Sequence, residues 1–144
     1  MRLTQFTDFG LRALMRLASE PGRSFTTDEM AAEFRISRNH LTKVVRQLAE
    51  ARYVVTQRGA AGGFRLARPA GEITLGAVVR TLENRQALVE CFRVDGGACV
   101  LTPLCRLKGH LAAAREAFLR ELDKTTLADC SYPAPKPVRK ERAV

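Results

Sequence analysis

Apolar residues recur every three or four positions near the start of the chain and predict a helix from about Thr4 to Glu20. Pro21-Gly22 is expected to end it, because neither residue favours a helix interior. Asp8, Arg12 and Arg16 follow one another at intervals of four residues and should share the polar face. The opposite, inward face is formed by Phe6, Phe9, Leu14, Leu17 and Ala18.

Two further helical stretches follow. Thr26 to Glu29 is a capping box, in which a threonine caps the helix and a glutamate lies three residues on. A tight turn at Arg35-Ile36 leads to Ser37, a candidate N-cap for the third helix. The inward positions of the two helices, at unbroken helical spacing, are Met30, Ala31 and Phe34, then Leu41, Val44, Val45, Leu48 and Ala49.

A short β-hairpin is predicted directly after the third helix. Tyr53 to Gln57 is rich in β-branched residues, and Phe64 to Leu66 returns as a second strand. The loop from Arg58 to Gly63 between them holds three glycines, and Pro69 closes the unit. The order helix, short helix, turn, helix and hairpin is that of a winged helix-turn-helix, which we assign to residues 1–70.

The second half of the chain predicts a linking helix, a loop and a long helix. The linking helix runs from Thr74 to Glu83 within residues 71–90, and a loop follows over residues 91–105. A long dimerisation helix over residues 103–125 is expected to start at Thr102-Pro103, since proline suits the first helical turn. Its apolar seam, at the 3-4-3-4 spacing that suits pairing with another helix, is Leu104, Leu107, Leu111, Ala114 and Phe118.

Composition agrees with one modest domain and an appendage. The 144 residues are 46% hydrophobic and 27% charged, which is ordinary for a globular chain. The appendage is a basic, proline-rich tail over residues 131–144, which we expect to be disordered. The predicted fold class is therefore mainly α with a small β-hairpin wing, a winged helix-turn-helix plus a long dimerisation helix.

An excess of positive charge indicates nucleic acid as a partner. Lys and Arg number 24 against 15 Asp and Glu, a net charge of +9, and residues 23–68 carry nine basic against four acidic side chains. The chain has no apolar stretch near its cysteines long enough to cross a bilayer, and Asp8 stands where a secretory signal would be apolar. We therefore expect a cytoplasmic protein with no membrane partner and with reduced thiols.

The start of the third helix carries side chains suited to reading DNA. A recognition helix enters the major groove by its N-terminal end, where arginine recognises guanine, asparagine recognises adenine, and serine or lysine contacts phosphate. In the wing, Arg58 would enter the minor groove, while Gly62 and Gly63 would let the backbone approach phosphates. The alternative is a solvated basic helix in a protein–protein module. The candidate DNA-binding residues of the helix are Ser37, Arg38, Asn39, His40 and Lys43.

Three of the four cysteines bracket one glycine-rich loop. Cys91, Cys99 and Cys105 have the spacing C-x7-C-x5-C, which lacks the C-x2-C pair of a zinc ribbon. Three thiolates on one loop can gather around a soft metal centre, and apolar neighbours would limit water there. The spacing alone leaves an iron–sulfur cluster, a zinc site and three unrelated thiols as open interpretations.

The spacing does not fix a fourth ligand. Cys130 lies beyond the long helix, and His110, five residues after Cys105, points away from it on a helix. Asp8 is an acid on the first helix, and its plain alternative is a surface salt bridge with Arg12, four residues on.

Five motifs, taken together, carry a resemblance to a known family. They are MRLTQFTDFGLRAL, SRNHLTKVV, RGAAGGFRL, LTPLCRLK at the end of the cysteine loop, and ELDKTTLAD. The combination, over about residues 1–130, resembles the IscR-like winged-helix iron–sulfur regulators and, among them, the nitric-oxide-sensing repressors of the NsrR group.

The resemblance implies a homodimeric repressor that binds palindromic operators in double-stranded DNA while it holds an iron–sulfur cluster. Nitrosylation of the cluster by nitric oxide would release the DNA and switch on nitric oxide detoxification genes. The implied cofactor is a 4Fe-4S cluster, with a 2Fe-2S form as the alternative. Its thiolate ligands carry over to Cys91, Cys99 and Cys105.

A fourth ligand and a switch are also implied by the resemblance. In members with a 4Fe-4S cluster, an aspartate of the other subunit's first helix completes the ligand set, and Asp8 matches it. Once freed, Asp8 would pair with Arg12 and loosen that helix. Members of the IscR type instead have a histidine three residues after the last cysteine, where this chain has Lys108.

Three other functions stay open from the sequence. One is a winged-helix regulator that senses iron–sulfur or redox status rather than nitric oxide. A second is a zinc-stabilised interaction module that does not bind DNA. The third, an enzyme or electron carrier, would leave the helix-turn-helix unused and has no nucleophile beside a base or acid–base pair to support it, so we expect a protein that is not an enzyme.

Overall fold

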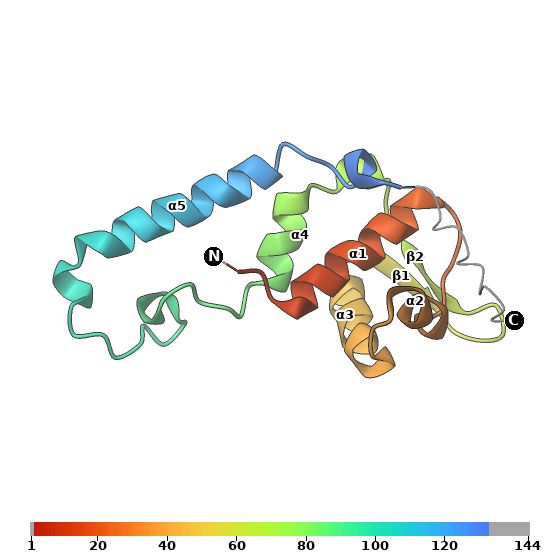
Figure 1. The fold of residues 1–144 in the computed structure, drawn as a ribbon, viewed down its shortest axis with the longest axis horizontal. Helices are drawn as coiled ribbons and strands as arrows, with labels where there is room; N and C mark the ends of the chain where they lie inside the picture. Colours follow the sequence, from red (N-terminus) through yellow and green to blue (C-terminus); the bar gives the residue numbers. More distant parts are fainter. Residues whose placement is uncertain (1, 133–144) are drawn as a thin grey trace, which may run out of the picture.

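Residues 2–132 are described by a computed structural model, in which helices surround one two-stranded antiparallel sheet. Figure 1 shows the first three helices and the hairpin gathered at one end, while the last helix reaches away from them. This arrangement confirms the predicted fold class. The elements are α1 (Gln5–Ser19), α2 (Thr27–Phe34), α3 (Arg38–Glu50), β1 (Val54–Gln57), β2 (Gly63–Leu66), α4 (Leu75–Leu82) and α5 (Arg106–Leu122), with short 3-10 turns η1 (Ala70–Glu72), η2 (Glu90–Phe92), η3 (Thr102–Leu104) and η4 (Ala128–Cys130).

One apolar core joins the three first helices, the hairpin, α4 and η4. The side chains at its centre come from six different elements or their edges, and each is at most 1% exposed. Because α4 and η4 contribute to this core, the segments before and after α5 both pack on the unit formed by α1, α2, α3 and the hairpin. The central side chains are Leu14, Met30, Leu41, Phe64, Val78 and Leu127.

Of the two predicted caps, Thr26 is confirmed, and Ser37 occupies its predicted position without a capping hydrogen bond; Thr4 caps the first helix as well. Thr4 Oγ1 accepts a hydrogen bond from the Thr7 amide at 3.2 Å, and Thr26 Oγ1 accepts one from the Glu29 amide at 3.1 Å. Ser37 occupies the N-cap position of α3, but its side chain makes no capping hydrogen bond. The first amides of α3 are exposed at the protein surface, where water or a ligand can satisfy them instead.

The wing is tied to the loop before α2 by backbone hydrogen bonds. The Phe25 amide donates to the Phe64 carbonyl at 2.9 Å, and the Phe64 amide donates to the Phe25 carbonyl at 2.8 Å. Gly63 beside them has a φ of +146°, and a Cβ there would lie 2.6 Å from the Phe25 carbonyl oxygen. A side chain at this position would therefore push the wing away from the helices.

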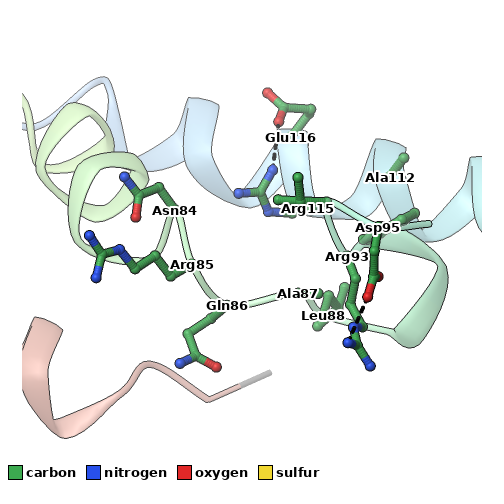
Figure 2. Close-up of a pocket in the computed structure, with 12 residues that line it drawn as sticks. Asn84, Arg85, Gln86, Ala87, Leu88, Arg93, Asp95, Ala112, Arg115 and Glu116 are labelled. Carbon is green, nitrogen blue, oxygen red and sulfur yellow. Dashed lines mark hydrogen bonds and ion pairs between the residues drawn. The ribbon is translucent and has the colours of Figure 1, made fainter. Parts of the chain in front are cut away.

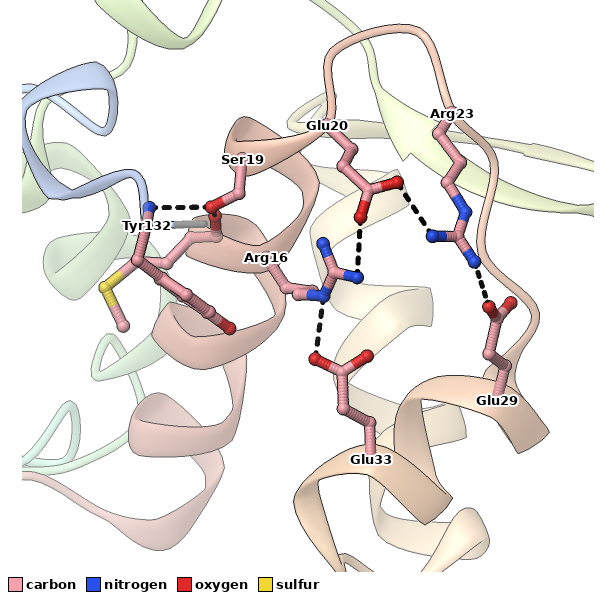
Figure 3. A network of polar contacts seen from close by, with 8 residues as sticks. Arg16, Ser19, Glu20, Arg23, Glu29, Glu33 and Tyr132 are labelled. Atoms are coloured by element: carbon pink, nitrogen blue, oxygen red, sulfur yellow. Dashed lines mark hydrogen bonds and ion pairs between the residues drawn. The ribbon is translucent and has the colours of Figure 1, made fainter. Parts of the chain in front are cut away.

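Arg16 departs from the predicted pattern of α1. The sequence placed it on the polar face with Asp8 and Arg12, but its side chain is buried, 4% exposed, between α1 and α2 (Figure 3). Its guanidinium pairs with Glu20 at 2.8 Å and with Glu33 of α2 at 2.7 Å. The helical period identifies which residues share a face, but not which element packs against that face. Here Glu33 of α2 lies against the last turn of α1.

Two carboxylates hold the charge of Arg16 in this site. Burial acts to lower the pKa of Arg16, but its hydrogen bonds with Glu20 and Glu33 outweigh burial and raise that pKa. Hydrogen bonds from Arg23 and Arg16 in turn lower the pKa of Glu20. The arginine therefore stays charged, and it fastens α1 to α2 as an ion.

The chain after α5 ends against α1. The Tyr132 amide donates to Ser19 Oγ at 2.8 Å, and the Ser131 hydroxyl donates to the Ala128 carbonyl at 3.0 Å. Burial raises the pKa of the Tyr132 phenol. Of these two residues, both expected within the tail, Tyr132 contacts α1 and Ser131 bonds to the turn η4, and the rest of the predicted tail, residues 133–144, lies outside the described residues.

α5 is fixed to α4 near its C-terminal end. Arg80 of α4 donates two hydrogen bonds of 2.8 Å to the two carboxylate oxygens of Asp123, and these bonds lower the pKa of Asp123. In Figure 1 the remainder of α5 extends away from this attachment. Within residues 2–132 no helix combines the length and the apolar character that a membrane crossing requires.

α5 begins later than its sequence predicts. Thr102 to Leu104 form the separate turn η3, and α5 starts only at Arg106. Cys105 between them is extended, with φ −78° and ψ 107°, so it interrupts the helical hydrogen-bond ladder and becomes the N-cap of α5. The apolar seam predicted for pairing is uncovered in the single chain, with Leu104 91% and Leu107 61% exposed.

The buried position of Arg16 predicts a stability difference between two arginines of one helix. Arg16→Met leaves Glu33 without its partner and should lower the free energy of unfolding by about 3 kcal/mol. Arg12→Met removes only an exposed pair and should cost less than about 0.5 kcal/mol. Urea unfolding of both variants followed by circular dichroism measures the difference, and equal losses would contradict the buried placement of Arg16.

Candidate functional site

The N-terminal end of α3 is exposed, as a groove-reading helix requires. Ser37, Arg38, Asn39 and His40 are all exposed, and Lys43 follows one turn later on the same surface. Leu41 and Val44, on the opposite face of the helix, are fully buried and fix this face outward. The helix-turn-helix thus presents five polar or charged candidate side chains together at the surface.

Arg38 has a protein partner that the sequence interpretation missed. Its Nε lies 2.8 Å from Oδ1 of Asp28 in α2, and both side chains are 69% exposed. A pair this exposed is weak and open to competition from another acceptor. Asp28 lies in the first turn of α2, so only the packing of α2 beside α3 brings it to Arg38, and no local pattern signals the pair.

His40 also faces a neighbour on α1. Its imidazole ring and the Phe9 ring are tilted against each other with centroids 6.5 Å apart. Phe9 directly follows Asp8, so this contact connects the helix that carries Asp8 with the recognition helix. Phe9 was predicted as a core residue, and its position at the edge of the core was not foreseen.

In the wing, Arg58 is exposed at the start of the turn. Gly62 and Gly63, in contrast, are required by close packing within the protein itself. A Cβ at Gly62 would lie 2.6 Å from the Gly59 carbonyl oxygen, and Gly63 is confined by Phe25 as described above. Close packing within the wing is therefore sufficient to require both glycines, apart from any approach to phosphate.

Asp8 and Arg12 form the ion pair that the sequence offered as a plain alternative. Arg12 Nη2 lies 2.6 Å from Asp8 Oδ2, and Arg12 Nε donates to Asp8 Oδ1 at 3.1 Å. The two side chains are 44% and 45% exposed. The Asp8 carboxylate thus lies at the surface, where a second molecule can reach it.

The cysteine segment, residues 84–105, connects α4 to α5. Glu90 Oε1 accepts a hydrogen bond from the Ala98 amide at 2.9 Å, and Asp95 Oδ1 accepts one from the Gly97 amide at 3.0 Å. Residues 90 and 98 adjoin Cys91 and Cys99, so the first bond closes the loop that runs between these two cysteines. All three cysteines of the segment are half-buried and free.

The donor set of this segment fits an iron–sulfur centre, although the thiols are not gathered around one point. Within the part of the chain that the structure describes, no three His, Cys, Asp or Glu side chains are grouped as a metal ion requires. Thr102 Oγ1, between Cys99 and Cys105 in sequence, is buried and has no hydrogen-bond partner among the described residues. A hydroxyl donor placed there suits a thiolate or sulfide acceptor.

Between the cysteine segment and α5 lies a hollow of about 960 Å³. Figure 2 shows Asn84 to Leu88 and Arg93 to Asp95 along one side and Ala112 to Glu116 of α5 along the other. Several large apolar side chains of the cysteine segment are exposed, among them Val94, Val100, Leu101 and Leu104. Large exposed apolar side chains in one region are typical of an interaction surface.

The other two candidates for a fourth ligand lie apart from this segment. Cys130 is half-buried in η4, which packs against α1 and η1 rather than against the cysteine segment. His110 is exposed on α5, one turn beyond Cys105. Neither joins a group of metal-binding side chains within residues 2–132.

Comparison with known proteins bears on this arrangement. The Rrf2 family, described as an iron-dependent transcriptional regulator, matches residues 3–132. The HTH-type transcriptional regulator NsrR of Geobacillus kaustophilus (strain HTA426) is 48% identical over 130 residues, which cover 90% of this chain and 88% of the relative. This similarity confirms the resemblance inferred from the motifs.

Solved structures share the fold over nearly the whole chain. The oxidized form of CymR from Staphylococcus aureus has a TM-score of 0.72 at 26% identity and covers 94% of this chain and 99% of its own. CymR of B. subtilis, described as the global cysteine regulator, has a TM-score of 0.71 at 29% identity and covers 90% and 95%. The IscR of T. potens, with a TM-score of 0.70 at 24% identity over 90% of this chain and 85% of that one, shares the fold alone. With an exposed helix-turn-helix and a family match over residues 3–132, the chain belongs to the Rrf2 family of transcriptional regulators and is not an enzyme.

Proposed function

We propose that this chain is a homodimeric repressor that binds palindromic operators, holds an iron–sulfur cluster and releases DNA in response to nitric oxide, so that nitric oxide detoxification genes are expressed. The observation that carries the proposal is the set of three half-buried, free cysteines on the one segment between α4 and α5. The 48% identity to a regulator called NsrR supports the same group of repressors.

The residues that would hold the cluster are Cys91, Cys99 and Cys105 of one chain and Asp8 of a second copy. A cluster bound there, 4Fe-4S or alternatively 2Fe-2S, would supply iron that reacts with nitric oxide. Thiolates are the soft donors that such a centre prefers, and a carboxylate is the hardest donor in the set. Asp8 is therefore the ligand most easily lost.

Arg12 is the partner available to a freed Asp8. Arg12 lies one turn along the same helix, within 2.6 Å of the carboxylate. Arg12 engages both oxygens of the carboxylate, so Asp8 would have to give up this pair to serve as a ligand on another subunit. Because Phe9 contacts His40 of α3, a displacement of this end of α1 would also displace the recognition helix.

Binding of DNA would use the exposed face of α3 and the wing. Arg38 would exchange the Asp28 carboxylate for the two acceptors of a guanine, and Asn39 is suited to adenine. Ser37, His40 and Lys43 would contact phosphates or bases, and Arg58 would reach the adjacent groove.

A second copy would cover the uncovered seam of α5. Leu107 and Phe118 of α5, with Leu104 of the turn η3 before it, are large apolar side chains, and each is at least 36% exposed in the single chain. A two-fold dimer would also place two recognition helices on one face of the DNA. Their spacing must match one helical repeat, about 34 Å, for both to enter the major groove.

The main experiment uses protein isolated without air. We expect coloured material with iron and sulfide in equal amounts, which binds operator DNA in a gel shift and loses it after addition of nitric oxide. Oxygen and peroxide are titrated in parallel, since release by these instead would identify a sensor of redox or iron–sulfur status. Colourless protein that contains zinc, or DNA binding that nitric oxide leaves unchanged, would reject the proposal.

Asp8→Ala tests the ligand from the second copy. It should alter the absorbance of the bound cluster and lower the DNA affinity of loaded protein towards that of unloaded protein, a change of about 5- to 150-fold. Glu72→Ala, an exposed acid in η1, is the matched control. The assignment fails if Asp8→Ala leaves absorbance, the rate of reaction with nitric oxide and DNA affinity all at wild-type values.

Arg38 and Lys43 predict two separable effects on DNA binding. Arg38→Ala should weaken operator binding by about 1–3 kcal/mol and relax the preference at one base pair of each half-site. Lys43→Ala should weaken binding to all sequences and reduce the slope of log K against log salt by about 2 for a dimer. Fluorescence anisotropy at several salt concentrations measures both, with Lys124→Ala, an exposed lysine beyond α5, as the control. A DNA-binding face elsewhere would leave both variants at the wild-type affinity.

A further inference from the structure

The last turn of α4, residues Thr81 to Glu83, contacts three parts of the DNA-binding unit, which comprises α1, α2, α3 and the hairpin. These parts are α1, α3 and Tyr53 before β1. The turn lies directly before the cysteine segment, which continues the chain from residue 84. Figure 1 shows α4 between α5 and the helices of the DNA-binding unit. Three consecutive residues of this turn each make a different contact.

Thr81 joins the turn to the recognition helix and to the wing. Its backbone carbonyl accepts a hydrogen bond from Gln47 Nε2 of α3 at 3.1 Å. Its hydroxyl lies 3.3 Å from the Tyr53 hydroxyl, directly before β1. Both contacts are partly buried, and the carbonyl belongs to the end of a helix, where carbonyls lack helical partners.

Leu82 fits against the bare backbone of α1. A Cβ at Gly10 would lie 2.5 Å from Leu82 Cδ1 and 3.6 Å from Val44 Cγ1 of α3. Leu82 is 5% exposed, so it packs tightly at the crossing of α1 with α3. Any rotation of this turn would therefore displace α1, α3 or both.

Glu83 binds the N-cap residue of α1. Its Oε1 accepts hydrogen bonds from both the amide and the hydroxyl of Thr4, each at 2.8 Å. Thr4 is the N-cap of α1, and Asp8 lies one turn further along that helix. The carboxylate next to the cysteine segment thus determines where the helix that carries Asp8 begins.

We propose that Gln47 and Glu83 are positioning residues, through which the state of the cysteine segment sets the position of the recognition helix by way of the last turn of α4. The inference rests on the proposed function, since it concerns how the loaded and unloaded states differ in DNA affinity. Neither residue has to touch DNA or the cluster. They transmit a change because the turn is covalently continuous with the cysteine segment and hydrogen-bonded to both helices.

The test compares DNA affinities of loaded and unloaded protein for each variant at one salt concentration. The wild-type ratio of the two affinities is expected to be about 5- to 150-fold. Glu83→Ala and Gln47→Ala should each reduce this ratio by about 2- to 30-fold. Glu83→Gln keeps an acceptor oxygen for Thr4 and should restore most of the wild-type ratio, which a general loss of stability would not do.

Glu72→Ala, an exposed acid in η1 outside the cysteine segment, is the matched control. Thermal unfolding verifies that each variant is folded, and if Glu83→Ala does not fold, Gln47→Ala decides alone. Hydrogen exchange in residues 44–50 provides a second readout, which should differ between loaded and unloaded wild-type protein and differ less in the variants.

The possible failures are distinguishable. A wild-type ratio near one would reject the proposed function itself. A normal wild-type ratio that persists in Glu83→Ala and Gln47→Ala would overturn the positioning role alone. Equal losses in Glu83→Ala and Glu83→Gln would also overturn it, because the acceptor oxygen at Thr4 would then be irrelevant.

Discussion

The position of α1 is the constraint on which the rest of this structure depends, and three separate contacts fix it. Glu83 receives two hydrogen bonds at the start of the helix, Leu82 packs on Gly10 at its middle, and Arg16 is buried between two carboxylates near its end. The first two contacts come from α4 and the third involves α2. α1 therefore packs against both α2 of the helix-turn-helix and α4, the helix that leads into the cysteine segment.

Local sequence patterns were sufficient for the elements of the DNA-binding unit. The apolar periodicity of α1 to α4, the threonine caps and the three-glycine turn each depend on residues close in sequence, so one sequence determines them. The five candidates on α3 were placed at the surface for the same reason, because Leu41 and Val44 fix the opposite face inward. Three cysteines on one segment were also evident from spacing.

What the sequence could not supply depends on partners distant along the chain. The helical pattern predicts Arg16 as a surface residue, but in the fold Glu33 of α2 pairs with it. Likewise, the sequence indicates no partner for Arg38, which pairs with Asp28 in the structure. The contacts of Gln47 and Glu83 span 34 and 79 residues, and no local pattern signals them. The start of α5 was misplaced because the extended Cys105 separates Pro103 from the helix it was expected to begin.

The ion pair between Asp28 and Arg38 has a consequence for how a protein of this kind searches a genome. Releasing the guanidinium from its carboxylate costs the same free energy on every stretch of DNA. A cost common to all sequences leaves their relative affinities unchanged, so discrimination comes from the two acceptors that a guanine offers in exchange for the carboxylate. Among the roughly 10⁶–10⁹ competing sites of a chromosome, the exposed pair is given up where that exchange is favourable.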